Sequence, residues 1–216
     1  MKTFQKMGGI AALIEAGTFV VGFVLLFTLL APLAEGNLDP VENVAFLAEN
    51  QTIIYIWNLI IYVVFGLFLV VLELALFDRL KTDPPILAQI ATAYGLIWAG
   101  LVIAAGMVAN IGTGVVVSLL NTNPAQAGSA WLAIDTVRNG LGGGNEIVGG
   151  VWVLLVSLAA LQTKRLPKAL NIFGIIIGFA GLATIVPPLG EIGGAIFGLG
   201  LIVWFIWLGI VMLRSA

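Results

Sequence analysis

Six long apolar runs constrain this chain more than any other feature of its sequence. They cover approximately residues 8–33, 53–77, 86–120, 146–161, 169–186 and 192–213. A helix of about 20 apolar residues crosses a bilayer. Only 9% of the residues are charged, whereas soluble domains carry about 25%. We therefore predict an all-α fold, a polytopic transmembrane helix bundle of six spans forming one membrane domain over residues 1–216, with the lipid bilayer as its main partner.

The prolines support these boundaries, because all eight fall at or beyond the end of an apolar run. The third run is too long for one perpendicular crossing, so we expect it to tilt, to continue past the membrane or to break near Gly112 and Gly114. The fourth run is short. The first run is longer than the core of a signal peptide and contains Glu15, which favours a retained span.

The distribution of basic residues predicts the orientation. The two termini, the second-to-third connection and the fourth-to-fifth connection hold eight of the nine lysines and arginines, and the other face holds only Arg138. Cytoplasmic loops carry the excess of basic residues. We therefore expect a multi-pass protein of the inner (cytoplasmic) membrane with both termini in the cytoplasm.

Two connections on the outer face carry helix-start signals. Asp39–Glu42 combines a capping acid, a proline and a second acid, which predicts a helix from Pro40 to about Glu49. Asn123–Gln126 repeats this pattern and predicts a helix towards Arg138. We expect short extra helices in the outer loops, the second broken by the glycines before the fourth span.

Absent residue types exclude several kinds of chemistry. The chain has no cysteine and no histidine, which removes thiol catalysis and the commonest haem and metal ligands. Every lysine lies at a terminus or in a loop. No basic patch is large enough to suggest a nucleic-acid partner. We expect no cofactor, no metal site and no catalytic residues, although a two-carboxylate acid–base site in the membrane stays open.

Glu15 and Glu73 lie inside apolar runs, where a carboxylate is costly. Both are placed at a similar depth from the cytoplasmic side, about 7 Å inside it at 1.5 Å per residue. If the first two spans pack together, the two carboxyls meet within hydrogen-bond reach, share a proton and become proton-linked groups. The alternative is that each extends separately to the cytoplasmic interface, near Arg79 or Lys6.

The stretch from residue 138 to residue 152 gathers polar groups and glycines at the threshold of the fourth span. We predict a substrate or ion site centred on Glu146, and Glu191 opens the sixth span in a similar way. Both glutamates are also explained as simple caps of helix dipoles. The candidate residues of this outward-facing site are Glu146, Arg138, Asn145, Asn110, Asn58 and Glu191.

Glycines recur at four-residue spacing in the last two spans, at positions 174 and 178 and at positions 190, 194 and 198. Small residues at this spacing let helix backbones approach closely. The short connection between the two spans favours a tight intramolecular hairpin. The alternative is a face for homo-oligomers.

Three segments resemble a family of small bacterial membrane proteins known only as a domain of unknown function. They are G-G-I-A-A-L-I-E-A-G near the N-terminus, the G-L-G-G-G-N-E-I-V-G-G-V-W-V-L-L-V-S block, and the closing G-L-G-x-I-V-W-F-I-W-L-G-I-V-M-L, where x is Leu201. The resemblance implies a six-helix inner-membrane protein and carries no activity or functional residues.

Two functions compete at this stage. In the first, the chain is a small transporter or channel-like protein that moves protons, cations or a small polar solute through a carboxylate-lined bundle. In the second, it is a non-catalytic accessory, sensor or complex-assembly protein whose carboxylates are structural. A hydrated passage between the carboxylate clusters favours transport, and a dry, packed interior favours the accessory role.

Overall fold

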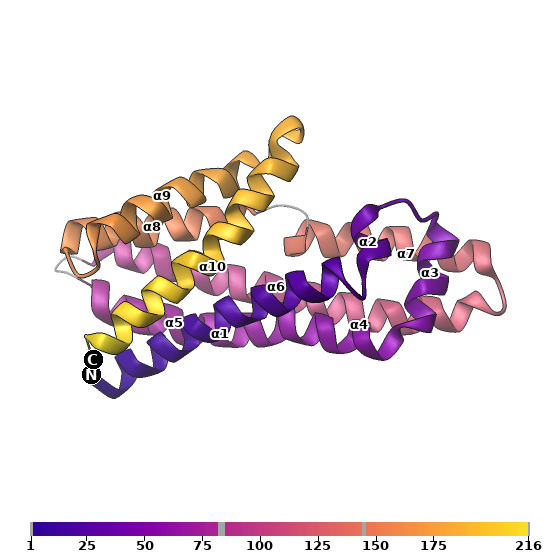
Figure 1. The fold of residues 1–216 in the computed structure, drawn as a ribbon, viewed down its shortest axis with the longest axis horizontal. Coiled ribbons are helices and arrows are strands. Elements are labelled where there is room, and N and C mark those ends of the chain that lie inside the picture. The colour runs from indigo at the N-terminus through magenta and orange to yellow at the C-terminus, as the bar shows by residue number, and fades with distance from the viewer. Residues whose placement is uncertain (1, 82–84, 144–145, 216) are drawn as a thin grey trace. The chain divides into compact units, whose positions relative to one another are not determined.

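A computed structural model describes residues 2–81, 85–143 and 146–215, which form helices and their connections without any strand. Figure 1 shows the chain as a series of helices. In order they are α1 (Lys2–Phe27), α2 (Ala31–Glu35), α3 (Pro40–Glu49), α4 (Gln51–Asn58), the π-helix η1 (Leu59–Val64), α5 (Phe65–Leu80), α6 (Ile86–Leu120), α7 (Pro124–Arg138), the π-helix η2 (Asn139–Gly143), α8 (Ile147–Thr163), α9 (Lys168–Ala183), the 3₁₀ turn η3 (Pro187–Leu189) and α10 (Gly190–Arg214).

The helices form two compact units. Unit 1 comprises Met1–Phe19, Phe65–Gly100 and Asn145–Ala216, and unit 2 comprises Val20–Val64 and Leu101–Gly144. The boundary falls within α1 and α6 and between η1 and α5. Within unit 1, the start of α1 and the end of α10 lie at the same end (Figure 1).

Helices α1 and α5 pack antiparallel in unit 1. A Cβ on Gly8 would collide with the Ala75 side chain, and further along the pair the rings of Phe19 and Phe65 meet edge-on at 5.5 Å. Residue numbers therefore rise along α1 in the direction in which they fall along α5. This register fixes the relative depth of every side chain on the two helices.

Glycines allow close backbone contact between helices of unit 1. A Cβ on Gly150 in α8 would lie 2.8 Å from the carbonyl oxygen of Gly178 in α9. A Cβ on Gly9 in α1 would lie 3.1 Å from the carbonyl oxygen of Gly209 in α10. The close-packing role predicted for Gly178 is confirmed, but its partner is the preceding helix α8.

The glycines at positions 190 and 194 do not mediate the packing of α10 against α9. A Cβ on Gly194 would meet nothing within 4 Å, and one on Gly190 only the Thr184 carbonyl at 3.7 Å. Gly193 and Gly200 pack against α9 instead. The predicted hairpin exists, and Gly174 on α9 packs against Trp204 of α10, but Gly190 and Gly194 lie on a face of α10 that is turned away from α9.

Unit 2 has its own apolar core. Its members come from the α1–α2 connection and from α3, α4, α6 and α7: Leu30, Val44, Leu47, Ile54, Trp57, Val116, Ala127 and Trp131. The indole N–H of Trp57 donates to the carbonyl oxygen of Gly22 at 3.1 Å, where it ties α4 to α1. This core holds the short helices α3 and α7 against the longer ones.

The local start signals are confirmed. The carboxylate of Asp39 accepts hydrogen bonds from the backbone N–H groups of Val41 and Glu42, and the Glu42 carboxylate accepts from the Asp39 N–H at 2.9 Å. The side-chain oxygen of Asn123 accepts from the Gln126 N–H at 3.2 Å. Helices α3 and α7 therefore begin at the prolines that follow these caps.

The third apolar run forms a single helix. Helix α6 runs unbroken over 35 residues, so the break considered near Gly112 and Gly114 does not occur. A Cβ on Gly112 would collide with Ile134, and one on Gly114 would lie 2.9 Å from the Tyr55 hydroxyl. These two glycines make room for neighbouring side chains instead of interrupting the helix.

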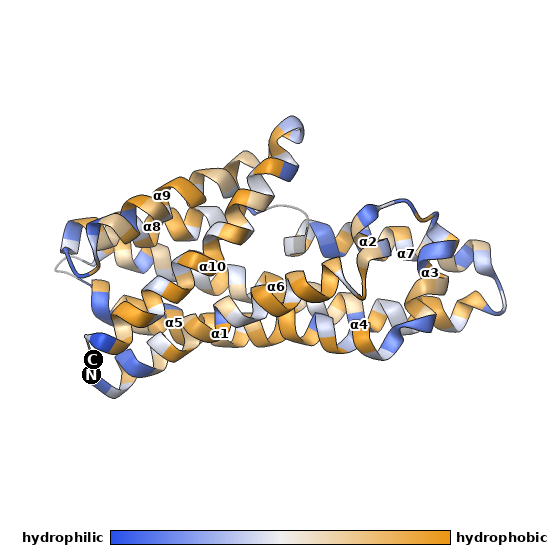
Figure 2. Cartoon of the chain, viewed as in Figure 1, coloured by the Kyte–Doolittle hydropathy of each residue, from blue (hydrophilic) through white to orange (hydrophobic). Residues whose placement is uncertain are grey.

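Among the described residues, five helical segments are long and apolar enough to cross a membrane by length and composition. They are Lys2–Phe27, Gln51–Leu80, Ile86–Leu120, Pro124–Thr163 and Pro187–Arg214. The fifth predicted span corresponds to α9, a shorter apolar helix of 16 residues. Figure 2 shows hydrophobic stretches along the long helices and hydrophilic residues where helices end.

Candidate functional site

The most deeply buried charged groups of unit 1 are Glu15 and Glu73, with 0% and 1% of their surface exposed. Glu73 lies on α5 and accepts a hydrogen bond on Oε2 from the indole N–H of Trp152 on α8. The hydroxyl of Thr92 on α6 lies beside the same carboxylate and donates to the Ala88 carbonyl at 2.9 Å. Three helices thus converge on one buried carboxyl group.

Gly95 makes this convergence sterically possible. It lies one turn after Thr92 on α6, and a Cβ there would lie 2.6 Å from Oε2 of Glu73 and 2.7 Å from Nε1 of Trp152. Real Cβ atoms do not approach polar atoms so closely. The absent side chain therefore provides the space that the carboxylate–indole hydrogen bond occupies.

Aromatic rings surround this hydrogen bond. The ring of Trp152 lies 5.4 Å from that of Trp98 and 5.7 Å from that of Trp204, measured between centroids. Phe65 and Phe205 extend the cluster, and both pack against Phe19 on α1. The cluster excludes solvent from Glu73 and so strengthens any electrostatic interaction that the carboxyl makes.

Glu15 is equally buried but has no partner. Neither of its carboxylate oxygens forms a hydrogen bond with any described residue. The nearby hydroxyl of Thr18 donates to the backbone carbonyl of Glu15 at 2.8 Å and leaves the carboxyl unsatisfied. A buried ionised carboxylate without a partner costs several kcal/mol or more, so this group needs a proton or a ligand.

Both sequence interpretations of this pair are wrong. Glu15 and Glu73 do not hydrogen-bond to each other, and neither side chain reaches the surface. The α1–α5 register explains the first error. Contacts of Gly8 with Ala75 and of Phe19 with Phe65 place Glu15 level with about residue 68, which is about 7 Å along the axis from Glu73 at 1.5 Å per residue.

Two further buried polar groups near the aromatic cluster have no hydrogen-bond partner in the described part of the chain. The hydroxyl of Ser157 on α8 and the indole N–H of Trp204 on α10 are buried and have no hydrogen-bond partner among the described residues. Both adjoin Gly174 on α9, where a Cβ would collide with the hydroxyl and lie 2.8 Å from the indole nitrogen. Unit 1 therefore holds unused donors as well as an unused carboxyl.

The two asparagines predicted for the outward-facing site meet in unit 2. The amide of Asn58 donates to the side-chain oxygen of Asn110 at 3.0 Å, and the amide of Asn110 donates to the Tyr55 carbonyl at 3.4 Å. The Asn58 oxygen is buried without a partner. Asn58 directly precedes the π-helix η1, and π-helical turns are frequent at functional sites.

Arg138 is already paired within unit 2. Its guanidinium forms a salt bridge with Asp135 at 2.6 Å and donates to the side-chain oxygen of Asn139 at 3.2 Å. Asp135 was overlooked at the sequence level, although its spacing of three residues on a helix predicts such a pair. Arg138 therefore has its counter-ion from its own helix.

Glu146 lies in unit 1 immediately before α8. Its backbone N–H donates to the hydroxyl of Thr184 at 3.0 Å, while its half-buried carboxylate makes no hydrogen bond with the described residues and does not cap α8. Glu191 is exposed in the first turn of α10, as expected for an acid at a helix start. Asn145 lies outside the described residues.

Several members of the buried site were not predicted. The partner of Glu73 is Trp152, 79 residues away in the chain, and the glycine that admits it is Gly95. The available signal was that a buried tryptophan needs an acceptor for its N–H, which a membrane carboxylate supplies.

No protein-family model, curated protein or solved structure matches the chain.

Proposed function

We propose that this chain is a small inner-membrane protein that carries protons, cations or a small polar solute, with Glu15 and Glu73 as its proton-linked groups. The observation that carries the proposal is the unpartnered carboxyl of Glu15, which is fully buried in unit 1. Glu146, half-buried and also without a side-chain hydrogen bond, is a further acidic group of the same unit in this proposal.

The physical reason lies in the cost of a buried charge. Ionisable residues within membrane helices are expensive and mark proton relays and ion pathways. Glu73 has an indole N–H as a permanent partner, whereas Glu15 has none and exchanges between a proton and a cationic or hydrogen-bonding ligand. The difference between the two carboxyls supports Glu15 as the group of the ligand-dependent step in this proposal.

The proposed topology has six crossings with both termini in the cytoplasm. An even number of crossings agrees with the ends of α1 and α10, which lie together in unit 1 (Figure 1). Helix α9 would be the short crossing, with 16 residues and a length of about 24 Å against a hydrocarbon core of about 30 Å. Local thinning of the bilayer accommodates such a mismatch.

The test is ion flux in liposomes that contain the purified chain and a pH-sensitive dye. We expect an imposed cation or pH gradient to produce proton movement above that of empty liposomes. Glu15→Gln removes the exchangeable proton with almost no change in volume, so flux falls to background while the protein remains folded. Glu73→Gln should also reduce flux.

Glu191→Gln is the matched control, because it makes the same chemical change at an exposed helix start. It should leave flux unchanged. If Glu15→Gln carries as much flux as the original chain, Glu15 is not part of a transport step. Absence of flux under every gradient would favour the accessory function.

The second candidate function is a non-catalytic accessory or assembly protein, and the close packing of unit 1 favours it. The Glu73–Trp152 hydrogen bond is enclosed by aromatic rings and by Gly95, and α8 contacts α9 through the backbones of Gly150 and Gly178. In that case Glu15 stays protonated. Glu15→Leu would then keep or increase stability, whereas a carrier would lose its flux.

A further inference from the structure

Unit 1 contains a pocket at the end where the chain starts and finishes. Its volume is about 590 Å³, within the range of small-molecule sites. Three separate chain segments supply its basic residues: Lys2 from α1, Arg79 and Lys81 from the end of α5, and Lys164 and Arg165 from the α8–α9 turn. The only acid among the described lining residues is Asp78.

Hydrogen bonds from two lining residues, Arg79 and Gln5, join the three chain segments of this pocket. The guanidinium of Arg79 donates to the backbone carbonyl of Arg165 at 3.2 and 3.1 Å, which ties α5 to the α8–α9 turn. It also donates to the side-chain oxygen of Gln5 at 3.4 Å. Gln5 in turn donates to the Ala75 carbonyl at 3.0 Å, which joins α1 to the same network.

These bonds leave most of the positive charge without a counter-ion. Asp78 pairs with Lys81 at 2.7 Å. The acceptors of Arg79 are a neutral amide and a neutral carbonyl, so its charge persists. Lys2 and the Arg165 guanidinium form no ion pair with the described residues.

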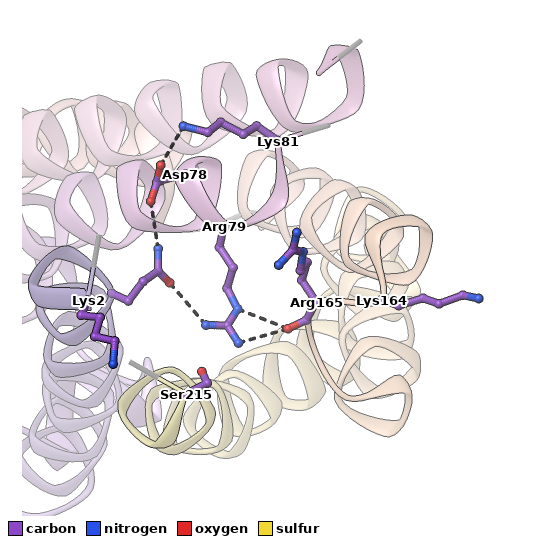
Figure 3. A pocket seen from close by; sticks show the side chains of 8 residues that line it. Lys2, Asp78, Arg79, Lys81, Lys164, Arg165 and Ser215 are labelled. Atoms are coloured by element: carbon purple, nitrogen blue, oxygen red, sulfur yellow. Dashed lines mark hydrogen bonds and ion pairs between the residues drawn. The ribbon is translucent and has the colours of Figure 1, made fainter. Parts of the chain in front are cut away.

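Two of the basic groups that line the pocket are guanidiniums, those of Arg79 and Arg165. Figure 3 shows the Arg79 guanidinium directed to the backbone carbonyl of Arg165, with both side chains lining the pocket while Lys164 extends away from it. Two guanidiniums and the free lysine Lys2 line one pocket, where their like charges repel one another. They match a phosphate group, whose oxygens accept several charge-assisted hydrogen bonds. An uncharged or cationic ligand would leave the repulsion unrelieved.

We propose that this pocket binds a phosphate-bearing anion, and that the headgroup of an anionic phospholipid supplies it. Basic pockets between membrane helices on the cytoplasmic side bind such headgroups. The pocket lies where helices of an apolar bundle end, so a headgroup reaches it while its acyl chains stay along the helices. The inference is independent of any role of Glu15 or Glu73.

The test measures the thermal stability of the full chain in a neutral detergent, titrated with phosphatidylglycerol. Phosphatidylcholine is the comparison lipid, and inorganic phosphate tests a soluble source of the same group. The pocket variant is the double substitution Lys2→Gln with Arg165→Gln. Both side chains are exposed, and the bond to Arg79 uses the Arg165 backbone, so the fold is retained.

The control is the double substitution Lys6→Gln with Lys168→Gln. It removes the same charge from exposed residues of α1 and of the first turn of α9, outside the pocket lining. We expect phosphatidylglycerol to stabilise the original chain and the control, and to bind the pocket variant more weakly by a factor on the order of 30.

A response to inorganic phosphate that the pocket variant loses would support the pocket with soluble phosphate compounds as its source. A response to phosphatidylglycerol alone supports the lipid headgroup. Equal responses of the two double variants would overturn the proposal. So would stabilisation by phosphatidylcholine as large as that by phosphatidylglycerol, or no stabilisation by any of the three.

Discussion

The polar pair that joins helices in unit 2, Asn58 and Asn110, is neutral, whereas unit 1 buries two carboxyl groups, Glu15 and Glu73. Asn58 donates to Asn110, and Asn110 donates to a backbone carbonyl, while the Asn58 oxygen stays without a partner within the described ranges. In unit 1, Glu73 has the indole N–H of Trp152 and the nearby Thr92 hydroxyl beside it, whereas Glu15 has no hydrogen-bond partner among the described residues. Neutral amides join helices at low cost, but a buried carboxyl changes its protonation or its ligand. Under the proposed function, unit 2 contributes helix association and unit 1 contributes the exchange of protons or ligands.

The largest expected effect follows from removing the partner of Glu73. Trp152→Ala deletes a fully buried ring and removes the indole donor of Glu73, so the free energy of unfolding should fall by about 3–5 kcal/mol. Trp152→Phe keeps an aromatic ring but removes the N–H, and it should cost about 1–3 kcal/mol. Unfolding in mixed micelles measures both.

Trp207→Ala is the control for this pair, since Trp207 on α10 is 36% exposed. Its loss should be clearly smaller than that of Trp152→Ala. Equal stability of Trp152→Phe and the original chain would mean that the indole–carboxylate bond contributes nothing to the free energy of unfolding. The hydrogen bond of Glu73 would then be no more important to stability than the weak amide bonds of unit 2.

An intermediate effect is expected at Gly95. Gly95→Ala places a methyl group against both partners of the bond, which should cost about 1–3 kcal/mol by overpacking. Gly100→Ala is a matched control on the same helix, because its Cβ would meet nothing within 4 Å. Alanine is the better helix former, so this control should be neutral or stabilising by up to about 1 kcal/mol. The same unfolding assay should therefore separate the two alanine variants.

The smallest effect is expected in unit 2. Asn110→Ala removes one interhelical hydrogen bond, and such bonds in membrane proteins contribute about 0.6 kcal/mol on average. Its unfolding free energy should change little, and liposome flux should be preserved. A loss of flux comparable to that of Glu15→Gln would break the proposed division of roles between the two units.

Local signals predicted much of the helical framework. The third apolar run ends where α6 ends, at residue 120. The acid–proline–acid pattern at Asp39 positions the start of α3. These features depend on neighbours within one turn, so one sequence is enough to predict them. The candidate site was less predictable, because Glu146 and Arg138 were chosen from one polar stretch and Arg138 is paired within its own helix.

Composition and apolar periodicity by themselves determined that this chain is helical and apolar enough for a membrane, and they identified Glu15 and Glu73 as costly groups. Only the tertiary structure decided which partner each carboxyl has. The α1–α5 register separates the two along the helix axis, and Gly95 admits Trp152 to Glu73 alone. A helix pattern gives the depth of a residue to within a few positions, but a hydrogen bond requires atoms placed within about 3 Å, and packing between helices sets that distance.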